Sequence, residues 1–151
     1  MKFSFRLSQT KSARALQPVS PELRKKLNQS ARQVVNAEIP DLKSFSLGVV
    51  FMSDEELLDL NNSSLGHDWY TDIITFEIDR SLTTLEAELY ISVTRAQENA
   101  QQASVPMETE LNLLIIHGLL HLAGYDDHDP VQKKRMRRRE RFFLAMGKNP
   151  T

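Results

Sequence analysis

Two histidines four residues apart, His117 and His121, are the residues whose type and spacing most directly indicate chemistry in this sequence. Residues four apart lie one turn above each other on an α-helix, so both imidazoles can reach one point, as in the H-x-x-x-H half of a zinc-binding helix. Gly124 follows shortly after and can adopt the left-handed conformation that ends a helix. The pair therefore predicts a metal site near the end of a helix.

The segment after Gly124 offers further ligands, because Asp126, Asp127, His128 and Asp129 follow within one loop. Asp127 or His128 can complete a set of three with the two helical histidines. Asp126 is our candidate for an acid that orients a ligating imidazole without binding the ion itself. The alternative is that the two histidines are ordinary core residues of an apolar helix. The third imidazole and the acids so close in sequence favour a metal site.

A zinc ion held by two imidazoles and one more nitrogen or oxygen ligand keeps one coordination position open for water. That water becomes a nucleophile near neutral pH, and the metal also polarises the oxygen under attack, so we expect hydrolysis. Zinc proteases with H-E-x-x-H use the glutamate beside the first histidine as general base, but the matching residue here is Gly118. Phosphodiester cleavage needs mainly stabilisation of charge and positioning of the strand, so the chemistry leans modestly away from a protease.

The run His-Gly-Leu-Leu-His-Leu-Ala-Gly-Tyr-Asp-Asp, residues 117–127, resembles the signature of the bacterial YbeY family, the metal-dependent endoribonucleases of ribosomal RNA maturation. Residues 71–76 (Thr-Asp-Ile-Ile-Thr-Phe) resemble the family's T-[DN]-x-[LI]-[ST]-F strand, and residues 88–92 (Glu-Leu-Tyr-Ile-Ser) resemble its G-D-I-x-I-S strand. With the chain length, the likeness covers nearly the whole sequence. The resemblance implies an α+β fold, a catalytic metal and an RNA substrate.

Three positions depart from the family pattern. The family most often has its third histidine where this chain has Asp127, and His128 comes one step later. Some members carry an acid there, so Asp127 is our first choice for the third ligand and His128 is its competitor. Leu65 stands where many members have an arginine thought to be functional, so no role is carried over to it. Ala87–Glu88 replaces Gly-Asp, which leaves the role of that acid open.

A basic stretch follows the metal-site loop, and seven of the 19 lysines and arginines fall between Lys133 and Arg141. Contacts of such cations with backbone phosphates are independent of sequence and sensitive to salt. The alternative is a solvated helix that Met136, Phe143 and Met146 anchor to the core. The residues that we predict to bind RNA are Lys133, Lys134, Arg137, Arg138, Arg139 and Arg141.

Length and composition limit the number of domains, the types of metal ligand and the cellular location that we expect. A chain of 151 residues is long enough for one hydrophobic core, so we expect a single domain over residues 1–151. The absence of cysteine excludes disulfides and thiolate ligands and suits a reducing cytoplasm. The first residues alternate apolar and polar types, unlike a signal peptide, and no stretch approaches the ~20 apolar residues of a membrane span. We therefore expect a cytoplasmic protein that does not bind membranes.

Hydrophobic spacing predicts the elements that position these residues. Strands are expected over residues 3–7, 46–52, 72–78 and 85–93. Helices are expected over residues 20–36, from 53 to about 60, after 92, over 106–123 and over 129–146, and residues 61–70 are expected to form a polar loop that includes His67. This mixture predicts an α+β fold, a small mixed sheet of about four strands packed against helices, with a central buried helix that carries the histidines.

The reading that we favour is a zinc-dependent endoribonuclease specific for single strands, with one Zn²⁺ per chain and with His117 and His121 as catalytic metal ligands. As the family resemblance implies, it would act in maturation of the 3′ end of the small-subunit ribosomal RNA and in ribosome quality control. Its partners would be the small-subunit rRNA precursor and the ribosome or small-subunit proteins. Two alternatives stay open, a minimal zinc metalloprotease and a ribosome-associated RNA-binding factor whose metal is structural. Oligomeric state does not follow from the sequence.

Overall fold

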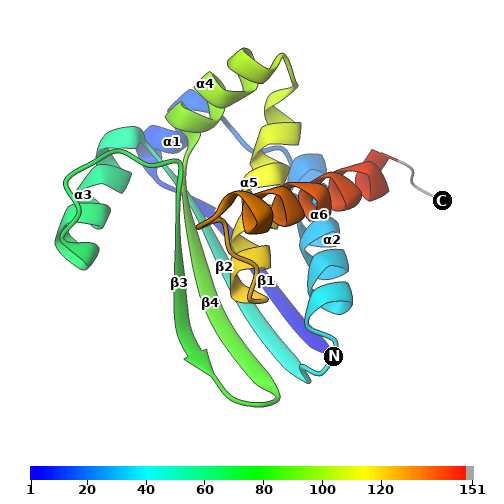
Figure 1. The fold of residues 1–151 in the computed structure, drawn as a ribbon. Coiled ribbons are helices and arrows are strands. Elements are labelled where there is room, and N and C mark those ends of the chain that lie inside the picture. The colour runs from blue at the N-terminus through cyan, green and yellow to red at the C-terminus, as the bar shows by residue number, and fades with distance from the viewer. Residues whose placement is uncertain (149–151) are drawn as a thin grey trace.

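The computed structural model describes residues 1–148 as four strands and six helices (Figure 1). The strands are β1 (Lys2–Gln9), β2 (Ser44–Met52), β3 (Ile73–Arg80) and β4 (Thr84–Ser92). The helices are α1 (Lys11–Leu16), α2 (Pro21–Glu38), α3 (Asp54–Leu65), α4 (Val93–Ala103), α5 (Met107–Leu122) and α6 (Pro130–Lys148). Residues 149–151, the end of the predicted domain, lie outside the described residues.

The strands form one mixed sheet in the order β1-β2-β4-β3. Strand β2 pairs in parallel with both β1 and β4, whereas β3 pairs antiparallel with β4. A register shift between Glu77 and Asp79 interrupts the last pairing. The predicted mixed sheet of about four strands is therefore confirmed.

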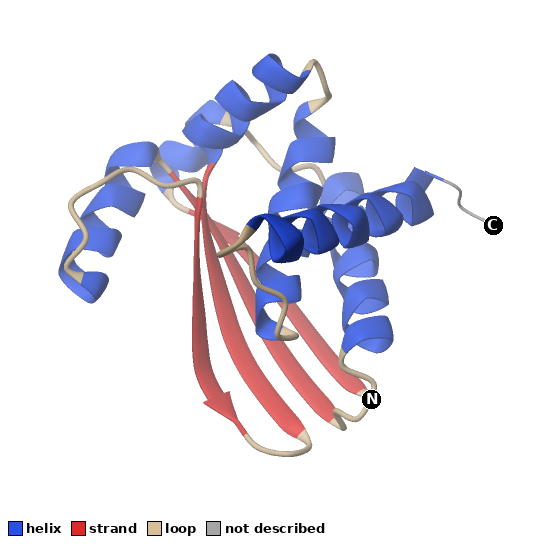
Figure 2. Ribbon diagram, in the orientation of Figure 1, coloured by secondary structure: helices blue, strands red, loops and turns tan. Residues whose placement is uncertain are grey.

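Helices cover one face of this sheet, and α3 covers part of the other (Figure 2). Alternate residues of β4, such as Leu89 and Ile91, belong to the main core with α2, α4 and α5. Leu57 of α3 packs on the opposite face with Met52 and Ile74. Helix α6 crosses α5 on the side away from the sheet, so α5 lies between the sheet and α6 (Figure 1).

The central position of α5 follows from its apolar sequence. Seven aliphatic residues of this helix are buried: Leu111, Leu114, Ile115, Ile116, Leu119, Leu120 and Leu122. Gly118 lets the helix approach β3 and β4 closely, because a Cβ atom there would lie 2.8 Å from Leu89 Cδ2 and 3.2 Å from Ile73 Cδ1. The residue that would be the glutamate of a zinc protease therefore faces the sheet.

Capping residues set the starts of α2, α3 and α4. The Ser20 hydroxyl accepts a hydrogen bond from the Leu23 amide at the start of α2. Ser53 and Glu56 form a complete capping box at the start of α3. At the start of α4, the Ser92 hydroxyl accepts a hydrogen bond from the Arg95 amide.

Three local predictions differ from the structure. Helix α3 continues to Leu65 through residues predicted as loop, because the side chain of Asn61 is buried and donates to the Trp69 carbonyl oxygen. Helix α1 was not predicted; the Thr10 hydroxyl caps it and Ala13 is its single buried residue. Strand β3, expected to end at residue 78, runs to Arg80 after its register shift.

Candidate active site

The imidazoles of His117 and His121 meet at the end of α5 with the carboxylate of Asp127. Their Nε2 atoms lie 3.1 Å apart, and Asp127 Oδ2 lies 4.0 Å from His117 Nε2 and 3.9 Å from His121 Nε2. These side chains are 28–40% exposed, so solvent reaches them. The three atoms form a group that could hold a metal ion.

Glu140 of α6 orients the first histidine. Its Oε2 atom lies 2.7 Å from His117 Nδ1, and its side chain is only 13% exposed. Burial lowers the pKa of His117, but the hydrogen bond and charge of Glu140, together with the charges of Asp127 and Asp72, outweigh it and raise that pKa. The Nδ1 atom of His117, which points away from His121, is thus held by a carboxylate.

The backbone of the loop orients the second histidine. His121 Nδ1 donates to the Tyr125 carbonyl oxygen over 3.1 Å, since a carbonyl can only accept. Gly124, at φ 101°, makes the turn that returns the chain to this position, and a side chain there would be strained. The sequence prediction that Gly124 turns the chain back after the helix is borne out.

These contacts fix the tautomers and make the pair suited to a cation. When neutral, both rings carry hydrogen on Nδ1, so two Nε2 lone pairs face each other at 3.1 Å. Such an arrangement is repulsive unless a proton or metal lies between the nitrogens. Ligand nitrogens of a tetrahedral zinc ion lie roughly 3.3 Å apart, given bonds of about 2.0–2.1 Å. The residues therefore fit a metal such as zinc.

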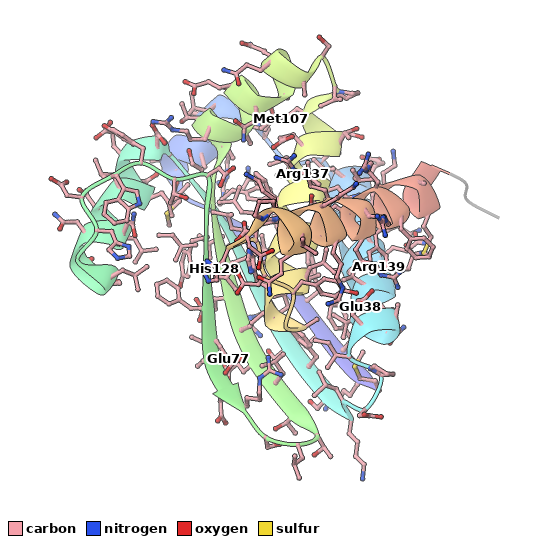
Figure 3. All side chains as sticks on the ribbon, viewed as in Figure 1. Glu38, Glu77, Met107, His128, Arg137 and Arg139 are labelled. Atoms are coloured by element: carbon pink, nitrogen blue, oxygen red, sulfur yellow. The ribbon has the colours of Figure 1, made fainter. Side chains whose placement is uncertain are left out.

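Asp126 and His128 are turned to each other rather than to the helix histidines. His128 Nε2 lies 3.2 Å from Asp126 Oδ2, and the His128 side chain is 84% exposed in the loop between α5 and α6 (Figure 3). The other oxygen of Asp126 accepts from the Asp127 amide. The carboxylate that orients a helix histidine is thus Glu140, where we expected Asp126.

A partly buried polar network links the residue before β3 with α4 and α5. The Asn99 amide donates to Asp72 Oδ2 over 3.2 Å and to Glu110 Oε1 over 3.3 Å. Asp72 belongs to the Thr71–Phe76 motif, and its charge contributes to the raised pKa of His117. This motif therefore supplies an acid whose charge acts on the candidate metal site.

A hydrogen bond from β3 also holds the end of α5. Arg80 Nη2 donates to the Leu122 carbonyl oxygen over 2.7 Å, and Arg80 pairs with Glu77 as well. A cation at a helix C-terminus satisfies free carbonyl groups and the helix dipole. The end of α5 that bears the histidines is thus fixed to the edge of the sheet.

The basic stretch lies on α6, and its cations differ in their surroundings. Lys133, Lys134, Arg137, Arg138 and Arg141 are exposed. Arg139 instead pairs with Glu38 of α2, as Figure 3 shows, and that carboxylate is 9% exposed. Met136 and Phe143 are buried and Met146 packs partly against the core, as predicted for the anchors of this helix.

Two of the positions that depart from the family pattern, Leu65 and Glu88, stand outside the candidate metal group, as does His67. Leu65 is exposed at the end of α3. Glu88 lies on the sheet face opposite α5, where it accepts a hydrogen bond from the Tyr90 hydroxyl. His67 is exposed and stacks on Trp69, with ring centroids 4.2 Å apart. Within residues 1–148, none of these three joins a group of potential metal ligands.

None of the helices in residues 1–148 has the length and apolar composition needed to cross a membrane.

Comparisons with known proteins identify the family of this chain. The family model described as endoribonuclease YbeY matches residues 10–147. Proteins named endoribonuclease YbeY from Cytophaga hutchinsonii and Bacteroides fragilis are each 41% identical over 102 residues, which cover 68% of this chain and 71% and 73% of those proteins. The solution structure of TM1509 from Thermotoga maritima aligns with a TM-score of 0.63 at 26% identity, covering 95% of this chain and 88% of that chain. Because the family model spans nearly the whole described chain, this protein belongs to the endoribonuclease YbeY family.

Proposed function

We propose that this chain is a single metal-dependent endoribonuclease domain that hydrolyses single-stranded RNA. The observation that carries the proposal is the convergence of His117, His121 and Asp127 on one solvent-accessible point, in a chain whose relatives are named endoribonuclease. His117 and His121 would bind the ion through Nε2, and Asp127 would bind it through its carboxylate. His128 remains the competing third ligand.

Zinc is the metal that we propose, at one ion per chain, because two imidazoles and a carboxylate are ligands that zinc accepts. When bound, the metal supplies an activated water and stabilises the charge that develops on the phosphate. In the neutral rings, Glu140 and the Tyr125 carbonyl hold the proton on Nδ1, so both Nε2 atoms would be available to the ion. The exposed cations of α6 would hold the phosphates of the strand beside the site.

Three protein ligands leave a coordination position for water, which favours a catalytic over a structural metal. The glutamate base of zinc proteases has no counterpart, since Gly118 packs against Leu89 and leaves no room for a side chain. Both features support a nuclease over the two alternatives. We further propose that the substrate is the small-subunit rRNA precursor at its 3′ end, that the protein acts in ribosome quality control with the ribosome as partner, and that it works in the cytoplasm.

The test is a cleavage assay with metal removal and return. Protein stripped by a chelator and reloaded with zinc should cut labelled single-stranded RNA, leave a duplex of the same sequence intact, and leave peptides intact. His121→Ala should lose both the metal and the cleavage. Metal-dependent peptide hydrolysis without RNA cleavage would establish the protease alternative. RNA binding without any cleavage by the metal-loaded protein would establish the structural-metal alternative.

A further inference from the structure

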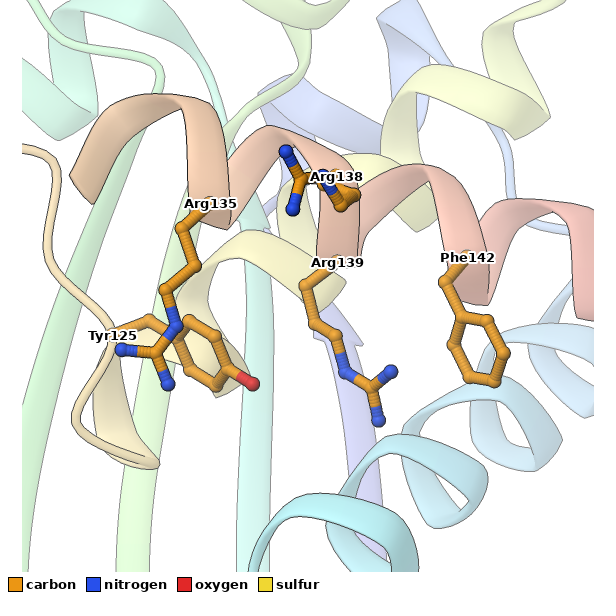
Figure 4. A pocket seen from close by; sticks show the side chains of 5 residues that line it. All are labelled: Tyr125, Arg135, Arg138, Arg139 and Phe142. Carbon is orange, nitrogen blue, oxygen red and sulfur yellow. The ribbon is translucent and has the colours of Figure 1, made fainter. Parts of the chain in front are cut away.

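A depression of about 320 Å³ lies beside the metal-site loop, on the side of α6 that faces α2. The residues that line it are Tyr125, Arg135, Arg138, Arg139 and Phe142. Figure 4 shows Arg135, Arg139 and Phe142 extending from α6 towards Tyr125 and α2. Its volume is at the lower end of the range for small-molecule sites, which is the size of one nucleotide rather than a folded RNA.

Glu38 arranges one wall of this depression. It pairs with Arg139 and accepts a hydrogen bond from the Tyr125 hydroxyl over 2.9 Å. Arg139 is therefore neutralised and structural, while Tyr125 is held in a fixed orientation.

Two cations of the depression remain available to a ligand. The guanidinium of Arg135 lies over the Tyr125 ring, 4.8 Å from its centroid. Within residues 1–148, neither Arg135 nor Arg138 pairs with a carboxylate. Stacking on a ring restricts an arginine and leaves its donors free for a phosphate.

The depression is also lined by an exposed aromatic ring, that of Phe142. Phe142 is 46% exposed although it is large and apolar, and Arg139 lies 4.4 Å from its ring centroid. Sites for single-stranded nucleic acid combine cations that track the backbone with aromatic rings on which bases stack. About two turns of α6 supply both the cations, Arg135 and Arg138, and the aromatic ring, Phe142.

The depression is also connected to the metal ligands. The backbone carbonyl of Tyr125 orients His121, while its ring forms part of the depression. Asp127 follows Tyr125 by two residues. A strand with one nucleotide in the depression would therefore pass the metal at a nearby linkage.

We propose that this depression is a nucleotide subsite for the single strand, in which a base stacks on Phe142 and a flanking phosphate binds Arg135 and Arg138. The subsite rests on the proposed ribonuclease function and adds a fixed register between the bound strand and the cleaved bond. It differs from the exposed cations Lys133, Lys134 and Arg141, which would attract any phosphate without fixing the register.

The base and phosphate contributions can be separated by salt. Metal-loaded protein would be titrated with a fluorescent 2′-O-methyl single-stranded oligonucleotide, checked to be intact afterwards, at several salt concentrations. Phe142→Ala should weaken binding about five- to a hundredfold and leave the salt slope unchanged, because stacking releases no counterions. Phe142→Trp should restore the affinity. Arg135→Gln with Arg138→Gln should lower the log-log slope by about 0.7, because the two arginines would neutralise one phosphate.

The matched controls are Ile78→Ala, which replaces an exposed apolar residue of β3, and Arg14→Gln, which removes an exposed cation of α1. Ile78→Ala should leave the affinity for the oligonucleotide unchanged, and Arg14→Gln should change it only by the small effect of one lost charge. Cross-linking of an oligonucleotide with one 4-thiouridine should join Tyr125 or Phe142, at one nucleotide position relative to the cleaved bond. If Phe142→Ala binds like the parent while the parent still cleaves RNA, the subsite is wrong and the ribonuclease function stands. If the parent neither binds nor cleaves single-stranded RNA, the function itself fails and the subsite fails with it.

Discussion

Glu140 is the only acid between Lys133 and Arg141, and it turns inward to His117. Acids that orient a ligating imidazole commonly raise metal affinity 10- to 100-fold. We expect Glu140→Gln to weaken zinc binding by about tenfold or more, because the amide can still accept the hydrogen bond but lacks the charge. Competition with a coloured zinc chelator measures this affinity directly.

The matched control is Glu22→Gln, an exposed acid in the first turn of α2. It should leave zinc affinity unchanged. The thermal midpoint of each metal-free variant shows whether the substitution weakens folding. If the metal-free midpoint is unchanged and only zinc binding falls, Glu140 acts by orienting His117. Equal zinc affinity of Glu140→Gln and the parent would show that the contact with His117 has no role in metal binding.

Asp127 and His128 can be compared as third ligands by single alanine variants. Asp127 lies near both helix histidines, whereas His128 is 84% exposed and pairs with Asp126. We therefore expect Asp127→Ala to lose most of its bound zinc and His128→Ala to retain it. Metal content after gel filtration decides the question, and loss in His128→Ala alone would reverse the assignment.

For individual residues, the sequence predicted which side chains lie together at the candidate site, but not all of their contacts. His117 and His121 share one helix, so their spacing fixes their approach, and Asp127 follows in the adjoining loop. The Glu140 contact depends on how α6 crosses α5, which local spacing does not determine. One signal was available: Glu140 shares a helical face with the buried Met136 and Phe143, which is unusual for an acid in a basic stretch.

Gly118 controls how closely α5 approaches the sheet. In Gly118→Ala, the new Cβ would lie 2.8 Å from Leu89 Cδ2, and such overpacking costs about 1–3 kcal/mol. Higher helix propensity returns about 1 kcal/mol. We expect a net loss of about 1 kcal/mol in the free energy of unfolding, measured by denaturant titration.

Gly147→Ala is the control for that substitution, because it changes a helical glycine with open space around it. A Cβ at this position would meet only Asn112 Nδ2, at 4.0 Å. The variant should be as stable as the parent or slightly more stable. If both substitutions stabilise the protein alike, helix propensity outweighs packing at Gly118, and the close approach of α5 is not restrictive.

At the scale of elements, the sequence predicted four strands and five of the six helices, because each has a long periodic face or a capping residue. Helix α1 was missed since six residues with one buried alanine carry almost no periodicity. The end of α3 was misplaced because Asn61 looks like a loop residue, yet it is 2% exposed and bonded to the chain beyond the helix. Strand order, which joins β1, β2 and β4 in parallel, is set by tertiary packing.

Glu110 is a buried acid of α5 whose pKa responds to the charges of Asp72 and Glu140. Burial raises its pKa, the Asn99 hydrogen bond opposes this, and the charges of Asp72 and Glu140 raise it further. A folded-state pKa above the unfolded value means that the native state binds the proton more tightly. The resulting stability is fully present below the unfolded pKa and is lost as pH rises through the folded pKa.

Glu110→Gln should therefore be more stable than the parent at neutral pH, where the parent carries a buried charge, and the difference should disappear at acidic pH. The neutral amide can still accept from Asn99 and contributes no repulsion towards Asp72. Denaturation midpoints of both proteins between pH 4 and pH 8 measure the effect. A constant difference across this range would mean that Glu110 does not titrate as its surroundings indicate.

Charge is also segregated over the surface, so a chain with a net charge of -1 can still bind a polyanion through α6. Lys133 and Lys134 are exposed at the start of that helix, next to the metal-site loop. The double variant Lys133→Gln/Lys134→Gln should lower the salt slope of single-stranded RNA binding by up to about 1.4, since each phosphate contact contributes about 0.7. Bound zinc should not change.

Lys11→Gln/Arg14→Gln removes two exposed cations from α1 and should shift affinity slightly without the same change of slope, because α1 does not adjoin the ligands. Equal slopes for both double variants would mean that the RNA follows another surface.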